Sequence, residues 1–276
     1  MSDEGDFQPV IRSETCSLSA ARRVAAMLDL SPDDLRDGQA LPVGWHFILL
    51  GADTRRSELR PDGFPGLGVP MPELGLPRLL IGGRTVAYRH AITIGREIRR
   101  VSVVKSIVQK TTSTGPMALV TVGHELFSDD VEEAAIVETQ TFVLLPTQAG
   151  VRAAVAEPKP VAASRMKTLM PDETLLFQYS ALGFNSHKIH LDKTHARDVE
   201  GFPDLVVNGG LTTLLLTEFA REALGLQLRG LRMKNLAPLY CGRSMTLTAD
   251  RDADQWTLAA YDDAGTLAAR MEIDIQ

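Results

Sequence analysis

Nine consecutive residues, FNSHKIHLD at positions 184–192, bring together two histidines, an asparagine and an aspartate, and His195 follows closely. Imidazole and carboxylate groups can ligate zinc or iron, transfer protons, or serve as buried hydrogen-bonding groups. The spacing of His187, His190 and His195 matches no established metal motif, and a structural zinc site would be expected to bring cysteines. We therefore expect no metal. We favour acid–base chemistry because the unperturbed pKa of histidine lies nearest to neutrality.

The second candidate feature is the beginning of a long apolar segment, NGGLTTLLLTEFAREALG, at residues 208–225. Asn208 is a favourable N-cap residue for a helix, and Gly209 and Gly210 leave the first-turn N–H groups open to close approach. Those N–H groups and the positive end of the helix dipole could stabilise an anion or a reacting thioester oxygen. Alternatively, the two glycines serve only to let the helix pack closely against a sheet.

The elements that must position these groups begin with residues 17–30, whose spacing predicts a short amphipathic helix. Residues 60–77 are rich in proline and glycine and predict a long loop. This loop either shapes a ligand pocket, with Trp45 and Phe64 as candidate lining residues, or fills a groove left empty in the first half. Four strand-like segments rich in β-branched residues follow at residues 84–94, 97–110, 117–127 and 134–145.

A second set of elements repeats the first in outline. Residues 91–96 (AITIGR) align with residues 238–243 (PLYCGR), and aspartate pairs at 129–130 and 262–263 each precede a closing strand. The segment 208–225 has apolar residues on nearly every side, which indicates a buried helix wrapped by a sheet. We therefore predict an α+β double hot-dog fold, in which two repeats each wrap an antiparallel sheet around a helix. The predicted boundaries are 1–146 for the N-terminal repeat, 147–170 for a linker and 171–276 for the C-terminal repeat.

A resemblance to a known family rests on two segments, FQYSALGFNSHKIHLD at residues 177–192 and LVVNGGLTTLLL at residues 205–216. Together they resemble the signature of the MaoC-like (R)-specific enoyl-CoA hydratases. They are most similar to the double-hot-dog subgroup, which includes hydroxyacyl-thioester dehydratases and the mesaconyl-CoA and itaconyl-CoA hydratases. Residues 41–50 and 77–84 resemble the non-catalytic first repeat of this subgroup. The resemblance implies a hydro-lyase that reversibly hydrates a short-chain enoyl-CoA, branched or dicarboxylic, without a cofactor.

The same resemblance assigns roles to the histidine-containing segment. His190 falls on the family's catalytic histidine and is expected to exchange a proton between water and the substrate. Asn185 falls where the general family has its catalytic aspartate. Because asparagine cannot take up a proton, we expect Asn185 to hold the reacting water by hydrogen bonds. His187 is expected either to carry a second proton or to orient His190.

Substrate binding is expected around the start of the apolar helix. The resemblance places the thioester carbonyl against the N–H groups of Gly209 and Gly210, with Asn208 in place of the family's preceding histidine. CoA carries several negative charges, whereas acidic residues outnumber basic ones by 35 to 29 in this chain. A local group of cations is therefore needed, and Arg232 and Lys234 are candidates. Each candidate could equally be a solvated charge on a strand face; the others are Arg84, Arg89, Lys105 and Arg229.

Composition limits the other classes of function. The net charge of −6 argues against general nucleic-acid binding. No apolar run reaches the roughly 20 residues that cross a bilayer, and the acidic start MSDEGDF is no signal peptide. Cys16 and Cys241 stand in unrelated contexts, so a cytoplasmic location is expected. The expected partner is an acyl-CoA thioester, with no nucleic acid and no membrane; a homodimer through paired sheet edges is expected, with a monomer as the alternative.

Three other functions remain open at this stage. One keeps the reaction and widens the substrate to straight-chain 3-hydroxyacyl thioesters of CoA or an acyl carrier protein. Another is a non-catalytic hot-dog protein that binds acyl-CoA. Asn185, which replaces the family's catalytic aspartate, is compatible with such a protein. The last is a metal-dependent hydrolase.

Overall fold

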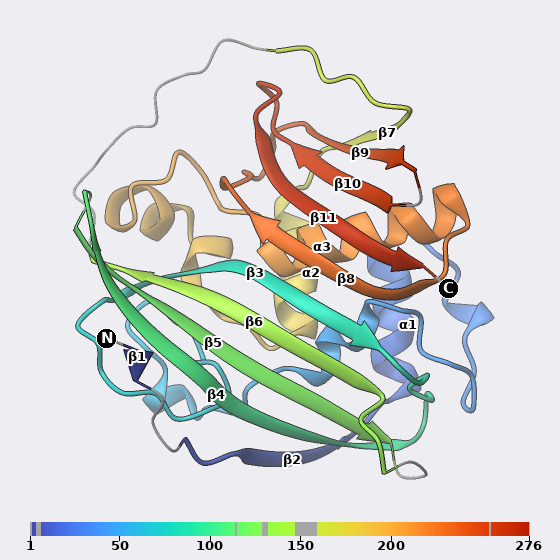
Figure 1. The fold of residues 1–276 in the computed structure, drawn as a ribbon, viewed down its shortest axis with the longest axis horizontal. Helices are drawn as coiled ribbons and strands as arrows, with labels where there is room; N and C mark the ends of the chain where they lie inside the picture. The colour runs from blue at the N-terminus through green and yellow to red at the C-terminus, as the bar shows by residue number, and fades with distance from the viewer. Residues whose placement is uncertain are drawn as a thin grey trace.

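The computed structural model describes residues 2–3, 7–113, 115–128, 132–146, 159–253 and 255–275. One antiparallel sheet of eleven strands dominates these residues, and the helices pack on one face of it (Figure 1). No helix in this part of the chain is both long and apolar enough to cross a membrane. The strands are β1 (Ser2–Asp3), β2 (Val10–Thr15), β3 (Arg78–Tyr88), β4 (Glu97–Thr112), β5 (Gly115–Ser128), β6 (Ile136–Leu145), β7 (Arg165–Leu169), β8 (Leu228–Asn235), β9 (Met245–Asp252), β10 (Gln255–Tyr261) and β11 (Leu267–Ile275).

Three α-helices and several shorter helical turns connect the strands. The shorter turns are of 3-10 type except η5 and η6, which are π-helical. The α-helices are α1 (Leu18–Met27), α2 (Glu173–Leu182) and α3 (Gly209–Glu218). The turns are η1 (Pro32–Asp34), η2 (Trp45–Leu49), η3 (Arg56–Glu58), η4 (Lys188–His190), η5 (His195–Val199) and η6 (Phe219–Ala223).

The strand order shows two repeats joined edge to edge. It runs β1-β4-β5-β6-β3-β8-β11-β10-β9-β7, with β2 also paired to β4. The alignment of residues 91–96 with 238–243 is confirmed, because Thr93 bridges to Ala40 as the aligned Tyr240 bridges to Val206. The predicted double hot-dog architecture is therefore correct, and β3 and β8 form the seam between its halves (Figure 1).

The two halves differ in what they wrap. The second half encloses α3, whose residues Leu211, Leu214 and Leu216 are buried, and the helix continues through the π turn η6. The equivalent position in the first half holds only the five-residue turn η2. There the loop rich in proline and glycine covers the sheet, and Phe64 packs in a core cluster with Leu79, Val104 and Phe142 among others. In the second half, the long helix fills the space beside the sheet. In the first half, part of the equivalent space stays open.

Two sequence-based boundaries need correction. The first strand was expected over residues 84–94, but β3 runs from Arg78 to Tyr88, directly after Pro77. The predicted linker over residues 147–170 contains the edge strand β7, which pairs with β9. Residues 147–158 of that linker and the aspartate pair at 129–130 lie outside the described residues. The division into repeats at 1–146 and 171–276 stays a prediction.

Close approach across the seam makes Gly83 a sensitive position. A Cβ on Gly83 would overlap the backbone oxygen of Met233, whereas a Cβ on Gly230 would lie 3.0 Å from the Val86 oxygen. Overpacking of this kind typically costs about 1–3 kcal/mol. We expect Gly83→Ala to lower the free energy of unfolding in urea by that amount, and clearly more than Gly230→Ala. Equal effects of the two substitutions would contradict the close contact at the seam.

Candidate active site

The end of α2 and the turn after it position the histidine-containing segment. Asp172 caps α2 by accepting a hydrogen bond from Leu175 N (2.8 Å), and the helix ends at Gly183. Phe184 then takes a left-handed conformation with a φ of 48°, which turns the chain back. Asn185 Oδ1 accepts a hydrogen bond from His187 N (3.1 Å), the side-chain turn typical of asparagine. Asn185 thus fixes the backbone that carries both histidines.

His190 has the geometry of a neutral base. Its Nδ1 lies 2.7 Å from the Val206 carbonyl oxygen. Because a carbonyl only accepts hydrogen bonds, Nδ1 carries the proton and Nε2 keeps a free lone pair. Burial lowers the pKa of His190 to about 4, although the bond to Val206 acts in the opposite direction. The imidazole is therefore unprotonated at neutral pH and able to accept a proton.

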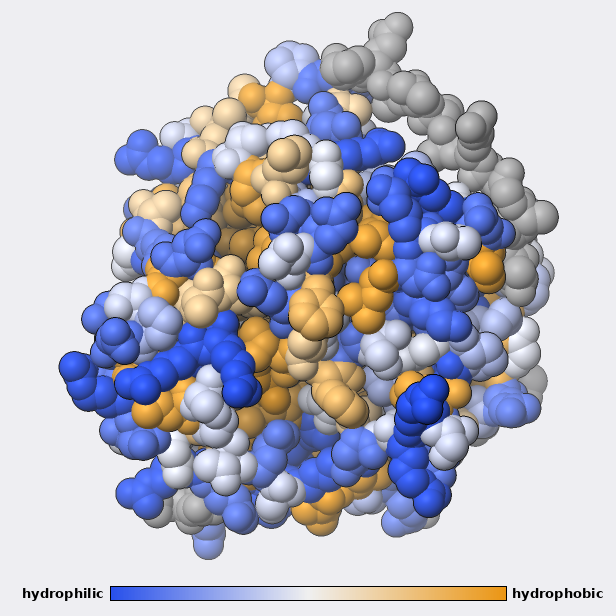
Figure 2. Space-filling model, turned by 180° about the vertical axis from the view of Figure 1, so that it is seen from behind, coloured by the Kyte–Doolittle hydropathy of each residue, from blue (hydrophilic) through white to orange (hydrophobic). Residues whose placement is uncertain are grey.

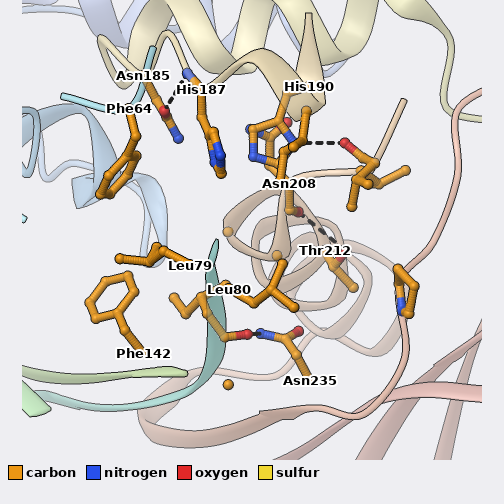
Figure 3. Close-up of a pocket in the computed structure, with 18 of the residues that line it drawn as sticks. Phe64, Leu79, Leu80, Phe142, Asn185, His187, His190, Asn208, Thr212 and Asn235 are labelled. Atoms are coloured by element: carbon orange, nitrogen blue, oxygen red, sulfur yellow. Dashed lines mark hydrogen bonds between the residues drawn. The ribbon is translucent and has the colours of Figure 1, made fainter. Parts of the chain in front are cut away.

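His187 lies beside His190, held by residues of the loop from the first half. The two imidazole rings are 5.5 Å apart in an edge-to-face arrangement, and the Phe64 ring lies 5.4 Å from His187 (Figure 3). His187 Nε2 is 3.7 Å from Asp62 Oδ2. Burial, with His190 nearby, lowers the pKa of His187 to about 2, so His187 is also neutral.

The loop is clamped onto the histidine-containing segment through its own backbone. Ser186 Oγ donates a hydrogen bond to Gly63 O (2.6 Å), and Lys188 N donates one to Asp62 O (2.8 Å). Lys188 Nζ donates a third to Pro61 O (2.7 Å). The first repeat thus helps to position the histidines of the second.

The start of α3 faces the same space. Asn208 is the N-cap residue by position, but its side chain does not cap the helix. Its Nδ2 donates to Ser180 Oγ (3.2 Å), while its buried Oδ1 has no partner among the described residues. The first-turn N–H groups of Gly209 and Gly210 also make no hydrogen bond within the described part of the chain. The helix therefore presents unused donors and one unused acceptor.

The glycines also permit close packing, which is the alternative interpretation of this turn, while the oxyanion role stays a prediction. A Cβ on Gly209 would lie 2.6 Å from Ile81 Cγ2 on β3. A Cβ on Gly210 would overlap the hydroxyl of Tyr179 and lie 3.3 Å from Arg84 Nη2. Both positions thus require glycine on steric grounds.

These groups line one cavity of about 590 Å³ between the two halves (Figure 3). This volume lies within the range of small-molecule sites. Its walls are largely apolar, and the space-filling view of the helix side shows apolar surface recessed between hydrophilic side chains (Figure 2). Six of the predicted site residues line it: Asn185, His187, His190, Asn208, Gly209 and Gly210.

The structure does not bring Arg232 and Lys234 to this cavity. Both lie on β8, and the Arg232 guanidinium makes an exposed ion pair with Asp274, whose Oδ2 is 2.8 Å from Nη1. Their alternation along the strand turns them away from α3. The candidate Arg84 does line the cavity, as does Phe64, whereas Trp45 is buried and donates to Glu218 Oε1 (2.7 Å).

Asp192 and His195 are the remaining potential metal ligands of the histidine-containing segment. Asp192 Oδ1 accepts a hydrogen bond from His195 N (2.9 Å), and His195 Nε2 lies 3.9 Å from Glu200 Oε1. The described residues contain no group of three His, Cys, Asp or Glu side chains arranged to hold a metal ion.

Three site residues were missed from the sequence: Asp62, Tyr179 and Ser180. Asp62 lies in a loop without periodicity, and no spacing relates it to His187. Tyr179 and Ser180 belong to the Tyr-Ser-Ala sequence, which was used for the resemblance but given no role. The helical position of Tyr179 one turn before Gly183 was the only available signal for its place at the site.

Comparison with known proteins agrees with this geometry. The family model of the hydroxyacyl-thioester dehydratases type 2 matches residues 44–241. The chain is 34% identical to the mesaconyl-C(4)-CoA hydratase of Chloroflexus aurantiacus, over 95% of this chain and 94% of that protein. It is 22% identical to the mitochondrial hydroxyacyl-thioester dehydratase type 2 of Schizosaccharomyces pombe, over 79% of this chain and 80% of that protein.

Solved structures support the fold. A MaoC-like dehydratase from Phytophthora capsici superposes with a TM-score of 0.71 at 12% identity, over 98% of this chain and 96% of that one. A Mycobacterium tuberculosis protein described as a double hot-dog gives 0.60 at 14% identity, over 99% and 96%. The family model and the relative from Chloroflexus aurantiacus place the chain in the hydratase and dehydratase class of enzymes. The chain belongs to the hydroxyacyl-thioester dehydratase type 2 family, a family of MaoC-like hydro-lyases.

The neutral histidines predict acid-sensitive stability. Burial also lowers the pKa of His124 to about 4, so three histidines stay unprotonated in the folded protein where the unfolded chain binds protons. Below the unfolded pKa of roughly 6.5, stability therefore falls with falling pH, by up to about 1.4 kcal/mol per pH unit for each histidine. The free energy of unfolding, measured by urea titration between pH 7 and 5, should fall with the summed slope of the three histidines. In His124→Gln this slope should be smaller by about a third. A stability that stays constant over this range would mean that these histidines titrate normally in the fold.

The clamp predicts a large effect at Gly63. Gly63 has a φ of 75°, and a Cβ there would lie 2.5 Å from Ser186 O. Gly75 has a similar φ of 67° with no atom within 4 Å of such a Cβ. Both alanine substitutions carry the same backbone strain, but only Gly63→Ala pushes the loop off the histidine-containing segment. We expect Gly63→Ala to lower kcat/KM at least about tenfold relative to Gly75→Ala, because small displacements of reacting groups are costly. Matching kcat/KM values would show that the clamp does not position the site.

Proposed function

We propose that this protein reversibly hydrates a short-chain, dicarboxylic enoyl-CoA of the mesaconyl-CoA type. The observation that carries the proposal is the placement of a neutral His190 and the unpaired N–H groups of Gly209 and Gly210 on one cavity. A base that activates water and donors that stabilise an oxyanion are the two requirements for addition to an enoyl thioester. The relative from Chloroflexus aurantiacus, whose name states a mesaconyl-C(4)-CoA substrate, supports the choice of acyl group.

The reaction adds water across the double bond conjugated to the thioester. The water oxygen forms a bond to the β-carbon while His190 Nε2 takes one of the water protons. The electron pair of the double bond moves toward the thioester oxygen, whose negative charge lies against the N–H groups of Gly209 and Gly210 and the positive end of α3. The α-carbon then takes up a proton from the imidazolium, which restores neutral His190. Dehydration follows the same steps in reverse.

Asparagine side chains orient the water in this mechanism. Asn208 Oδ1 is a buried acceptor without a partner among the described residues, so it can accept a hydrogen bond from the second O–H of the water. Asn185 Oδ1 is occupied by His187 N, which leaves its amide nitrogen to face the cavity. His187 orients His190 in this proposal, because the two imidazole rings meet edge to face.

A second substrate class is favoured by a specific observation. The matching family model and the Schizosaccharomyces pombe relative are named for hydroxyacyl-thioester dehydration. The same groups would dehydrate a straight-chain 3-hydroxyacyl thioester by the reverse reaction, and itaconyl-CoA is a further dicarboxylic candidate.

The two free and buried cysteines, Cys16 and Cys241, fit the cytoplasmic location that we propose.

Replacing the base tests the proposal. We expect His190→Ala to lower kcat for mesaconyl-C4-CoA by about 10²–10⁴, the usual contribution of a general base. Loss of the enoyl-thioester absorbance measures the rate, and the thermal midpoint monitors folding. His90→Ala is the control, since His90 is exposed and its Nε2 lies 3.3 Å from Glu133. A folded His190→Ala protein with the rate of the wild type would refute the assignment of His190 as the base.

A further inference from the structure

Arg84 is a buried cation whose hydrogen-bonding capacity is only partly used. It lies on β3, and its side chain is 9% exposed. Its Nη1 lies 3.1 Å from Glu138 Oε1. Its Nε is buried without a hydrogen-bond partner among the described residues. No described residue accepts a hydrogen bond from Nη2 either, and Nη2 points to the first turn of α3, 3.3 Å from the Cβ position of Gly210.

The acidic partner of Arg84 stands behind the cavity wall. The Glu138 side chain is 0% exposed and does not line the cavity, whereas Arg84 does. His46 Nε2 lies 2.7 Å from Glu138 Oε2, and Gln140 Nε2 donates to Glu138 Oε1 (2.6 Å). Although burial alone would raise the pKa of Glu138, Arg84 and His46 hold it below its usual range. The wall thus presents the cation of the pair and hides the anion.

The other charged residues of the cavity wall differ in this respect. Among the described lining residues these are Arg78 and Glu200, and both members of that pair reach the cavity. Arg78 Nε lies 3.1 Å from Glu200 Oε2. The charges of Arg78 and Glu200 offset one another at the wall. Among the described lining residues, Arg84 therefore supplies the positive charge that no lining carboxylate offsets.

A second donor accompanies Arg84. The Tyr179 ring stacks on Phe47 at 4.6 Å, which directs the hydroxyl to Gly210. Burial raises the pKa of Tyr179 to about 12, so the hydroxyl keeps its proton and can donate it. Tyr179 also lines the cavity, and its hydroxyl makes no hydrogen bond among the described residues. Two donors without acceptors therefore meet beside the helix start.

Resting on the proposed function, we propose that Arg84 and Tyr179 bind the free carboxylate of a four-carbon dicarboxylic acyl-CoA. The Nε and Nη2 edge of a guanidinium forms two parallel hydrogen bonds to a carboxylate, and this edge of Arg84 is unused. Both donors lie against Gly210, whose N–H receives the thioester oxygen together with the N–H of Gly209. The distance from thioester to carboxylate is therefore short, as in a butenedioyl unit.

The same geometry selects against acyl groups without a carboxylate. A methyl group in that place would leave the buried edge of Arg84 unpaired and without water. Sites built to hydrogen-bond a substrate group reject analogues that lack it far more strongly than apolar pockets reject a misfit. Arg84 is thus a residue that determines substrate specificity, whereas His190 determines the rate.

The test compares two isosteric substrates, mesaconyl-C4-CoA and 3-methylcrotonyl-CoA, which differ only in a carboxylate replaced by a methyl group. The quantity measured is the ratio of their kcat/KM values, so that intrinsic reactivity cancels between variants. We expect Arg84→Gln to lower this ratio about 10²-fold and Tyr179→Phe to lower it about tenfold, as befits lost hydrogen bonds to a charged group. Arg89→Gln is the control directly after the end of β3, since Arg89 is exposed, does not line the cavity and is paired with Glu133.

The outcomes separate the two proposals. If the wild type hydrates none of mesaconyl-C4-CoA, 3-methylcrotonyl-CoA and crotonyl-CoA, the hydratase function and the carboxylate site are both overturned. An active wild type whose ratio is unchanged by Arg84→Gln would overturn only the carboxylate site. If Arg84→Gln does not fold because Glu138 loses its partner, the double variant Arg84→Gln/Glu138→Gln removes both charges and replaces the ion pair by amides. Its ratio should fall as in the single variant, and an unchanged ratio would again overturn the site.

Discussion

The start of α3, where Asn208 is buried and Gly209 and Gly210 are half-buried, is the constraint on which the rest of this structure depends. A helix leaves its first N–H groups without partners, and burying such groups without acceptors is unfavourable. Here Asn208 does not cap them, because its amide is hydrogen-bonded to Ser180. The two glycines let neighbouring side chains come into close contact with the helix start. In the reaction that we propose, a substrate oxygen supplies the acceptor that the fold leaves out. The feature that is unfavourable in the free protein would then stabilise a developing charge.

The difference between the two halves explains why one pseudo-symmetric fold has one such site. The second half supplies α3 and the histidines, while the first half replaces its long helix with the turn η2 and a packed loop. That replacement opens room for an acyl group against β3 and lets Asp62 and Phe64 reach His187. Neither half alone contains a complete site. The seam between β3 and β8 is therefore a functional as well as a structural junction.

The sequence was informative where the chemistry is local. His187, His190 and the Asn208–Gly210 turn lie within two short segments whose family resemblance implied that they form one site. The buried apolar helix and the repeated strand pattern predicted the fold. Arg84 was found only as one of several cations, because its burial depends on which strands pair at the seam. Asp62 lies more than a hundred residues from His187, on a loop whose path no periodicity describes. Arg232 on β8 does not line the cavity and pairs with Asp274 on the neighbouring strand β11. Nothing in the sequence indicates this pairing.

The most direct test of the account is a crystal structure of the His190→Gln variant with bound mesaconyl-C4-CoA. We expect the thioester oxygen at about 3 Å from the N–H groups of Gly209 and Gly210, the usual hydrogen-bonding distance. We also expect the β-carbon to face the side chain at position 190. A thioester bound away from the start of α3, with its oxygen against other groups, would contradict the central claim.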